Sequence, residues 1–462
     1  MASTKIVAGV DSSTQSVKIV LRNAETGELI KSASRPHPDG TEVDPAHWWK
    51  ALQEVIAEVG GVEAFDAIGI AGQQHGMVVL DENGEVIRPA LLWNDTRSSK
   101  GAAELNSEFP EIHISTGSKL VASFTATKLR WLKDNEPENA EKVRAVALPH
   151  DWLSWKLSGS KNLDDLFTDR SDASGTGYFN PVTNEYEMDI LVRALGHSNL
   201  KLPKVISANA FGFDNKNLRI SAGAGDNASG ALGVGANVGD LIISLGTSGT
   251  AFAVSATPTQ DPKGEIAGFA DASGNFLPLA CTLNAAKIFS KTAELLNISF
   301  EKFSELALQA EPGAGGLLFM PHFDGERTPN RPNAKGAIQG ITHTNFTPAN
   351  IARASIEGVI AGIAYAGFGL ENLGVKCDRI LLIGGAAKNQ AVQQIATEIF
   401  GQDVYAPPAG EYVADGAARQ AAWALLGGAN PPKWNQGEFE LIKMQKSAPE
   451  VRARYFDAIS KM

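Results

Sequence analysis

The sequence predicts an α/β protein made of two halves with related architecture. Short apolar strands alternate with helices that carry one apolar face, which is typical of α/β domains. The strand at 6–10 and the hydroxyl-rich turn at 11–16 have a counterpart in the strand at 241–245 and the turn at 246–250. The two segments are offset by 235 residues, about half of the chain. This offset indicates a duplicated fold, because solenoid repeats are far shorter.

Composition restricts the class of protein. The chain has 462 residues, 43% of them hydrophobic and 20% charged, which is typical of two or three folded domains and excludes a disordered chain. The net charge of −11 disfavours nucleic acid or an anionic membrane surface as a partner. Cys281 and Cys377 are too few for a disulfide scaffold or a zinc site.

A cytoplasmic location is expected from the same reasoning. The first residues do not show the ordered basic, apolar and cleavage regions of a secretory signal. The longest uncharged helical stretch, 358–370, is too short to span a bilayer.

In the first half, strands at 6–10, 17–21 and 29–33 are separated by polar turns and predict a meander. Asp44 followed by Pro45 predicts the beginning of a helix, with apolar residues at helical spacing behind it. A strand at 67–70 then ends in Ala71-Gly-Gln-Gln-His-Gly76.

In the second half, Thr347 and Pro348 predict the start of a helix that runs to about Leu373 and is buried on all sides. A strand at 379–383 breaks into Gly384-Gly-Ala-Ala-Lys-Asn389 before another helix, a layout that lets a nucleotide approach the backbone closely. Asp415 is expected to cap a final helix over 416–425.

The two hydroxyl-rich turns are candidate phosphate sites. Such turns expose backbone N–H groups that can hold an anion without any net positive charge. Two facing turns would grip one polyphosphate from both sides. A single Gly/Ser/Thr hairpin is common without any ligand, so the prediction depends on the pair.

Asp226 stands alone in a run of small residues, 221–235. Small neighbours let a substrate approach, and a general base must lie within hydrogen-bond reach of the proton that it takes. The alternative is that Asp226 only caps a tightly packed helix.

Three more side chains have two interpretations each. Asp11 ends a strand beside the first turn, where it would hold Mg²⁺ or simply form the turn. His75 would donate a hydrogen bond to a substrate hydroxyl or be an exposed loop residue. Trp93 would form the wall of a sugar pocket or belong to the core.

Motifs throughout the chain resemble those of the FGGY carbohydrate kinases. The resemblance covers nearly the whole length and keeps the motif order. It depends on Gly9-Val-Asp-Ser-Ser-Thr-Gln-Ser-Val-Lys18, Gly72-Gln-Gln-His-Gly76, Leu91-Leu-Trp-Asn-Asp-Thr-Arg97, Phe124-Thr-Ala-Thr-Lys-Leu-Arg-Trp-Leu132, Ser171-Asp-Ala-Ser-Gly175, Gly225-Asp-Asn-Ala-Ser-Gly230, Ser244-Leu-Gly-Thr-Ser-Gly-Thr250, Gly325-Glu-Arg-Thr-Pro329, Arg353-Ala-Ser-Ile-Glu-Gly358 and Gly384-Gly-Ala-Ala387.

The resemblance implies two duplicated actin-like domains of the ribonuclease-H type, with a cleft between them. We place the N-terminal domain, with the sugar site and the first phosphate turn, at 1–238, and the C-terminal, ATP-binding domain at 239–462. The implied activity is ATP-dependent phosphorylation of a sugar hydroxyl, with Mg²⁺ as cofactor and a homodimer as a common assembly.

The resemblance also implies site residues. Asp226 is expected to be the general base. The residues expected to face the sugar are Gln74, His75, Asp226 and Asn227. Those expected near ATP are Thr14, Gly246 and Thr247 at the phosphates, Gly385 and Asn389 at the adenosine, and Asp11 at the metal.

The sugar is less firmly predicted than the chemistry. His75 followed by Gly76 favours D-xylulose, phosphorylated on its C5 hydroxyl, over glycerol. Ribulose, gluconate, glycerol or another polyol is the alternative substrate, and a non-catalytic actin-like ATP-binding protein is the alternative class. Two departures matter: many relatives have glycine in place of Ser13, and many bacterial relatives have methionine in place of Gln74. Serine disfavours a left-handed turn there.

Overall fold

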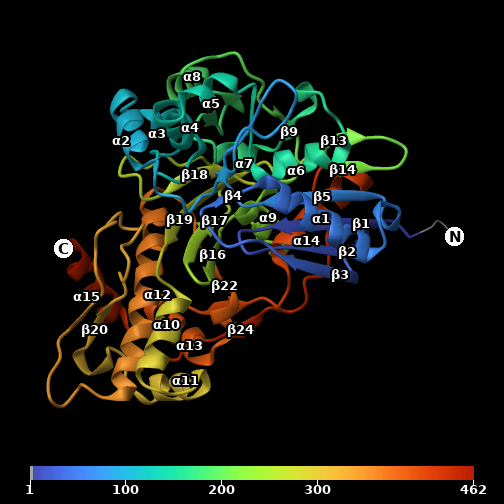
Figure 1. The fold of residues 1–462 in the computed structure, drawn as a ribbon. Coiled ribbons are helices and arrows are strands. Elements are labelled where there is room, and N and C mark those ends of the chain that lie inside the picture. The colour runs from blue at the N-terminus through green and yellow to red at the C-terminus, as the bar shows by residue number, and fades with distance from the viewer. Residues whose placement is uncertain (1–3, 462) are drawn as a thin grey trace.

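The structure, a computed structural model that describes residues 4–461, contains two large sheets (Figure 1). The first has seven strands: β1 (Ile6–Ser12), β2 (Ser16–Asn23), β3 (Leu29–Pro36), β5 (Ala67–Gly72), β13 (Phe211–Asp214), β14 (Arg219–Ser221) and β15 (Ala224–Gly225). The second also has seven: β16 (Asp240–Leu245), β17 (Gly249–Ala253), β18 (Ala267–Ala270), β19 (Phe276–Thr282), β22 (Arg379–Ile383), β23 (Val404–Ala406) and β24 (Glu440–Ile442).

The two sheets share one topology. β1 pairs antiparallel with β2 and parallel with β5, and β16 pairs in the same two ways with β17 and β22. A third strand, β3 or β19, extends each antiparallel meander. The predicted α/β fold with two related halves is therefore confirmed, and the turns after β1 and β16 occupy equivalent positions.

Each half inserts further elements between its strands. The first half adds β4 (Glu42–Val43), β6 (Val78–Leu80), β7 (Ala90–Leu91), α2 (Ser99–Glu108), α3 (Ile112–Thr116), α4 (Thr125–Asn135), α5 (Pro137–Lys142), β8 (Ala145–Ala147), α6 (Pro149–Ser158), β9 (Phe167–Thr168), α7 (Arg170–Ser174), β10 (Phe179–Asn180), β11 (Glu185–Tyr186), α8 (Met188–Leu195) and β12 (Lys204–Val205). The second adds α10 (Ala286–Leu295), α11 (Phe300–Gln309), β20 (Leu318–Met320), β21 (Ala337–Gln339), α13 (Gln390–Phe400) and α15 (Pro449–Ser460).

Apolar helix faces cover the sheets. The helix α1 (Pro45–Val59) buries Trp48, Leu52 and Val55 against the first sheet. The helix α12 (Pro348–Asn372) is buried along most of its length against the second. The whole helix is long and apolar enough to cross a membrane, although the uncharged stretch 358–370 within it is too short. However, 83% of its most apolar 18-residue window is buried inside the molecule. This burial accounts for its composition.

Two central helices connect the halves. The helix α14 (Tyr412–Leu426) follows the second sheet in sequence but packs on β1 and β5 of the first, where Figure 1 shows it red beside the blue strands. A Cβ atom on Gly9 would lie 2.0 Å from the carbonyl oxygen of Ala414, so the helix touches the strand backbone. α14 also packs closely on α9 (Asp226–Val234). The predicted boundary between 238 and 239 falls in the loop after α9 and stays a prediction.

Of the caps predicted for three helices, at Asp44, Thr347 and Asp415, the structure confirms the first two. The Asp44 carboxylate accepts from the N–H of Ala46, and the Thr347 hydroxyl accepts from that of Asn350, so both predicted caps are confirmed. Asp415 does not cap α14, which begins at Tyr412. Its carboxylate instead pairs with Arg22 on β2 at 2.6 Å. This correction has a tertiary cause, because the partner lies on the first sheet.

Candidate functional site

Asp226 is placed by strand register. It is the first residue of α9 and follows β15, in which Gly225 pairs with Gly72 at the end of β5. Gln73 to His75 follow β5, so this pairing brings Gln74 to the start of α9. A Cβ on Gly225 would lie 2.7 Å from the Gln74 side chain, which shows how closely the two segments pack.

Asn227 orients the Asp226 carboxylate. Oδ1 of Asp226 accepts from the backbone N–H of Asn227 at 2.7 Å and from its Nδ2 at 2.8 Å. Burial raises the pKa of Asp226 to about 6, although the bonds from Asn227 oppose the shift. The N-cap of α9 is Gly225, so the alternative that Asp226 caps this helix is wrong. Asp226 is a carboxylate with a raised pKa at the edge of the first sheet.

Asp11 lies at the same edge. It ends β1, where it pairs with Ala71 of β5, and its carboxylate accepts from the Ser13 hydroxyl. Burial raises the pKa of Asp11 to about 7, and the negative charge of Asp226 adds to the shift. The two predicted acidic residues therefore interact across the sheet edge. Ser13 is not among the described residues with positive φ, so its turn is not left-handed.

Thr14 is held by side chains on both sides. The indole N–H of Trp93 donates to the Thr14 hydroxyl at 2.9 Å, and this hydroxyl donates to Oε1 of Gln73 at 3.2 Å. Gln73 is 1% exposed. The half-buried Trp93 therefore lies against the first turn, and the chain of hydrogen bonds ties this turn to the segment after β5.

His75 has an unusual backbone and a neutral ring. Its φ of 69° is left-handed, a conformation that non-glycine residues rarely adopt away from functional sites. Nδ1 lies 2.6 Å from the carbonyl oxygen of Gly175, which only accepts, so Nδ1 carries the proton. Burial and the positive charge of Lys128 lower the pKa of His75 to about 3. The free Nε2 is therefore an acceptor, and the predicted donor role is corrected.

Lys128 is a residue that sequence reasoning missed. It lies on α4, is 0% exposed, and donates from Nζ to the carbonyl of His75 at 2.7 Å and to that of Ser123. Thr125 also donates to the His75 carbonyl, at 3.2 Å. These bonds hold the left-handed backbone in place. The available signal was a lysine inside the motif at 124–132.

Two side chains of the C-terminal half complete the surroundings of His75. The ring centroid of Phe269, on β18, lies 5.7 Å from that of the imidazole, and the rings of Phe124 and the imidazole are 4.8 Å apart. Arg327 lies near enough that its charge also lowers the pKa of His75. Sequence reasoning missed both residues because their position depends on how the halves dock.

The residues expected near ATP gather at the edge of the second sheet. The turn with Gly246 and Thr247 follows β16, and Gly384 follows the neighbouring β22 with a φ of 94°. A Cβ on Gly384 would lie 2.7 Å from the Leu245 carbonyl oxygen, so only glycine fits this approach. Gly385 comes next in the chain.

A cavity of about 460 Å³ adjoins this edge. It is lined by Phe300, Glu301, Ser304, Glu305, Leu308, Gly385, Lys388, Asn389 and Gln390. The Asn389 Oδ1 caps α13 by accepting from the N–H groups of Ala391 and Val392, so only its Nδ2 is free to serve a ligand. Both residues predicted for adenosine thus border one hollow.

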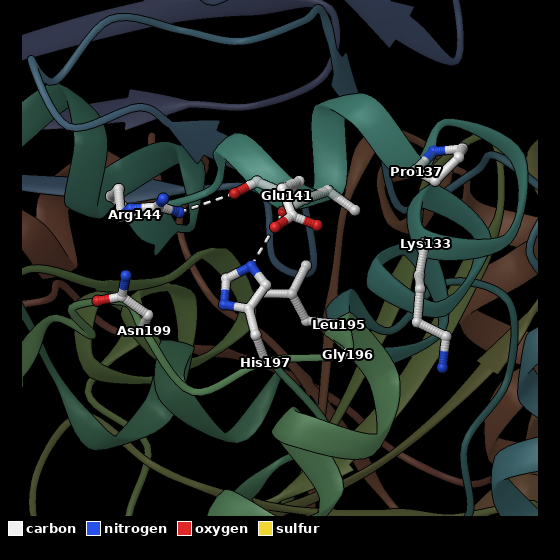
Figure 2. Close-up of a pocket in the computed structure, with 9 residues that line it drawn as sticks. Lys133, Pro137, Glu141, Arg144, Leu195, Gly196, His197 and Asn199 are labelled. Atoms are coloured by element: carbon white, nitrogen blue, oxygen red, sulfur yellow. Dashed lines mark hydrogen bonds between the residues drawn. The ribbon is translucent and has the colours of Figure 1, made fainter.

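A second cavity, of about 450 Å³, lies away from these residues (Figure 2). Its lining comes from α4, α5 and the segment after α8. Arg144 donates to the Glu141 carbonyl at 2.8 Å, and His197 Nε2 donates to that of Ala140 at 3.0 Å. The polar groups facing this cavity therefore bind their own backbone, and no predicted site residue lines it.

Two family models match the chain. The N-terminal domain of the FGGY family of carbohydrate kinases matches residues 6–233, and the C-terminal domain matches residues 241–425. The chain belongs to the FGGY family of carbohydrate kinases. The predicted family is confirmed.

Individual relatives agree over the full length. The chain is 41% identical to a xylulose kinase of Streptomyces coelicolor, over 94% of this chain and 92% of the relative. It matches the crystal structure of xylulose kinase from Bifidobacterium adolescentis with a TM-score of 0.91 and 41% identity, over 99% of each chain. A gluconate kinase from Lactobacillus acidophilus, at 24% identity, has a TM-score of 0.88, and the match covers 99% of this chain and 97% of that chain. The actin-like fold is therefore confirmed, and fold alone does not distinguish sugars.

Proposed function

We propose that this chain transfers the γ-phosphoryl group of ATP to the C5 hydroxyl of D-xylulose, with Asp226 as general base. The observation that carries the proposal is the position of Asp226, with its raised pKa, beside Gln74 and Asp11 at one sheet edge. The relatives named xylulose kinase support the choice of sugar.

Asp226 acts on the attacking hydroxyl. Its pKa of about 6 makes it a stronger base than an ordinary carboxylate while leaving it ionised at pH 7. Phosphoryl transfer has a loose transition state, so positioning contributes more than proton removal. Asn227 therefore serves the reaction by aiming the carboxylate.

Two side chains proposed to bind the sugar, His75 and Gln74, each present a hydrogen-bond acceptor. His75 offers Nε2 as an acceptor to a sugar hydroxyl. Gln74 uses its Nε2 on the Ser171 carbonyl at 2.8 Å, so its Oε1 also faces the substrate as an acceptor. A sugar whose hydroxyls donate to both acceptors is preferred, because one that leaves either unpaired loses binding energy.

The nucleotide is held by both turns. Thr14, Gly246 and Thr247 approach the phosphates, while Gly385 and Asn389 border the adenosine cavity. Asp11 fits Mg²⁺, since it is a buried carboxylate that accepts, among residues 4–461, a side-chain hydrogen bond from Ser13 alone. When bound, Mg²⁺ neutralises phosphate charge.

The test is ADP release with Mg-ATP and each of D-xylulose, D-ribulose, L-ribulose, gluconate and glycerol. The proposal expects the highest kcat/KM with D-xylulose. A higher value with another sugar would overturn the choice of substrate but not the kinase activity. ADP release that does not depend on any sugar would contradict both.

A further inference from the structure

A buried charged cluster lies behind the proposed base. His150 at the start of α6 and Asp151 and Asp172 are each 0% exposed. His150 Nδ1 lies 2.5 Å from Oδ2 of Asp172 and 3.2 Å from Oδ1 of Asp151. Burial raises the pKa of Asp151 and raises that of Asp172 to about 8, so the three groups adjust one another's protonation inside the protein.

Both nitrogens of the His150 ring donate hydrogen bonds. Nε2 lies 3.1 Å from the carbonyl oxygen of Ala222, which only accepts, so Nε2 carries a proton. Nδ1 faces the Asp172 carboxylate. Burial opposes the charged ring, but Asp151 and Asp172 outweigh it and raise the pKa of His150 to about 10. His150 is therefore an imidazolium with two committed N–H groups.

Both ring nitrogens of His150 are committed to oxygen acceptors, so the cluster as it is arranged offers no free imidazole nitrogen to a metal. His150, Asp151 and Asp172 bring their polar atoms within 4.8 Å of one another, close enough to suggest one. A metal ligand must offer a lone pair, and a doubly protonated imidazole has none. The cluster must serve another purpose.

The cluster holds the backbone that leads to Asp226. Ala222 lies between β14 and β15, and its carbonyl accepts from His150. The next residue, Gly223, exchanges two hydrogen bonds with the Gln420 side chain of α14, at 2.7 and 2.8 Å. The N–H of Gly225 donates to the Ser171 hydroxyl at 3.1 Å. Three contacts therefore fix this segment just before Asp226.

The same cluster reaches the sugar side. Asp172 lies beside Ser171 on α7, and the Ser171 carbonyl accepts from Gln74. The His150 ring is held in a narrow slot, because a Cβ on Gly223 would lie 2.4 Å from it and one on Gly72 would lie 3.0 Å from its Cβ. His150 thus joins α7, the segment after β5 and the segment before α9.

We propose that His150 and Asp172 are positioning residues that set Asp226 against the sugar and Gln74. The Asp172 carboxylate keeps the His150 ring doubly protonated, and the ring bridges Asp172 to the Ala222 carbonyl. This role rests on the proposed function of Asp226. Neither residue touches substrate.

Asp172→Asn is the first test because it preserves shape. Asparagine carries no negative charge, so the charge-assisted bond between residue 172 and His150 is lost and the ring is held less firmly. A misplacement of about 1 Å costs about 100-fold in rate, so we expect kcat to fall by about 10- to 100-fold. The KM for ATP should stay unchanged, since Gly385 and Asn389, the residues proposed for adenosine, lie beside the other sheet.

His150→Gln and His150→Lys form the second test. Glutamine lacks the charge and should lower kcat as Asp172→Asn does. Lysine restores a cation with three donors and should recover a measurable part of kcat. Trp155→Phe is the matched control, because it removes a buried hydrogen bond to the Asn162 carbonyl from the same helix without touching the cluster. It should leave kcat unchanged.

Melting temperatures show which variants are folded, and Asp226→Ala is measured in parallel. Wild-type kcat and sugar KM in folded Asp172→Asn, with Asp226→Ala inactive, would overturn this inference alone. Equal losses of kcat in Asp172→Asn and Trp155→Phe would also overturn this inference, since the effect would then be general destabilisation. Full activity in Asp226→Ala would instead overturn the proposed function.

Discussion

The two sheets use the same edge for different chemistry. After β5, the first half continues with Gln73, Gln74 and His75, whose side chains bind Thr14 and the carbonyls of Ser171 and Gly175, respectively. After β22, the second half continues with Gly384, where a Cβ would meet the Leu245 backbone, and then with Gly385, which faces open space. The same topology thus places side chains at the proposed sugar site and glycines at the proposed nucleotide site.

The equivalent turns differ in charge. The first turn begins with the buried Asp11, and the residue at the corresponding position of the second turn is Gly246. A carboxylate on one side suits a divalent cation, whereas N–H groups on the other side suit phosphate oxygens. Duplication therefore supplied the frame, and a few substitutions made the halves complementary.

The largest effect is expected from removing the one base. Asp226→Asn retains an oxygen that can accept from Asn227 but cannot take a proton, so kcat should fall by about 10²- to 10⁴-fold. Steady-state ADP release with D-xylulose measures it. Asp39→Asn, at an exposed position, removes the same charge and should leave kcat unchanged. Wild-type kcat in Asp226→Asn would contradict the assignment.

The difference between the turns is tested by Asp11→Asn. The pKa of Asp11 is about 7 in the folded protein against 3.8 normally, so the folded state holds the proton more tightly. Stability from this group is present below about pH 4 and is lost as pH rises through about 7. The variant should be more stable than wild type at pH 8, by about 1–3 kcal/mol, yet less active.

Urea unfolding without nucleotide or Mg²⁺, at pH 5 and pH 8, measures this effect. The stability gain of Asp11→Asn should be smaller at pH 5 than at pH 8. An equal gain at both pH values would show that burial of the Asp11 charge is not its cause.

The separation of the sugar and nucleotide sites is tested by a crossed pair of variants with smaller effects. Lys128→Met removes one donor from each of two carbonyls, and that of His75 keeps only the Thr125 hydroxyl among the described residues. The loss costs about 1–3 kcal/mol and should raise the sugar KM about tenfold. Asn389→Ala loses a helix cap, worth about 1 kcal/mol, and should raise the ATP KM several-fold.

In each variant of this pair, the other KM should stay within about twofold of wild type, which corresponds to less than 1 kcal/mol. Steady-state titration of each substrate at saturating co-substrate measures both constants. Parallel rises of both KM values in both variants would mean that the two sheet edges do not work as separate sites.

Local patterns in the sequence determined much of this protein. The duplicated strand and turn, the caps at Asp44 and Thr347, and the small residues around Asp226 are all short-range features. Each depends on spacing or on hydrogen bonds between residues a few positions apart, so it can be recognised without a structure. The motif order carried the family assignment for the same reason. A cytoplasmic location and a homodimer stay predictions.

Tertiary structure alone decided the rest. Asp415 pairs with Arg22, and the Gly175 carbonyl makes His75 an acceptor; both contacts join residues far apart in the chain. The sequence alone does not distinguish Lys128, His150 and Asp172 from ordinary helix residues, although all three are buried. The protonation and the role of each charged group depend on how deeply it is buried and on which partner it meets. Burial and partners are established only when segments far apart in the chain pack together.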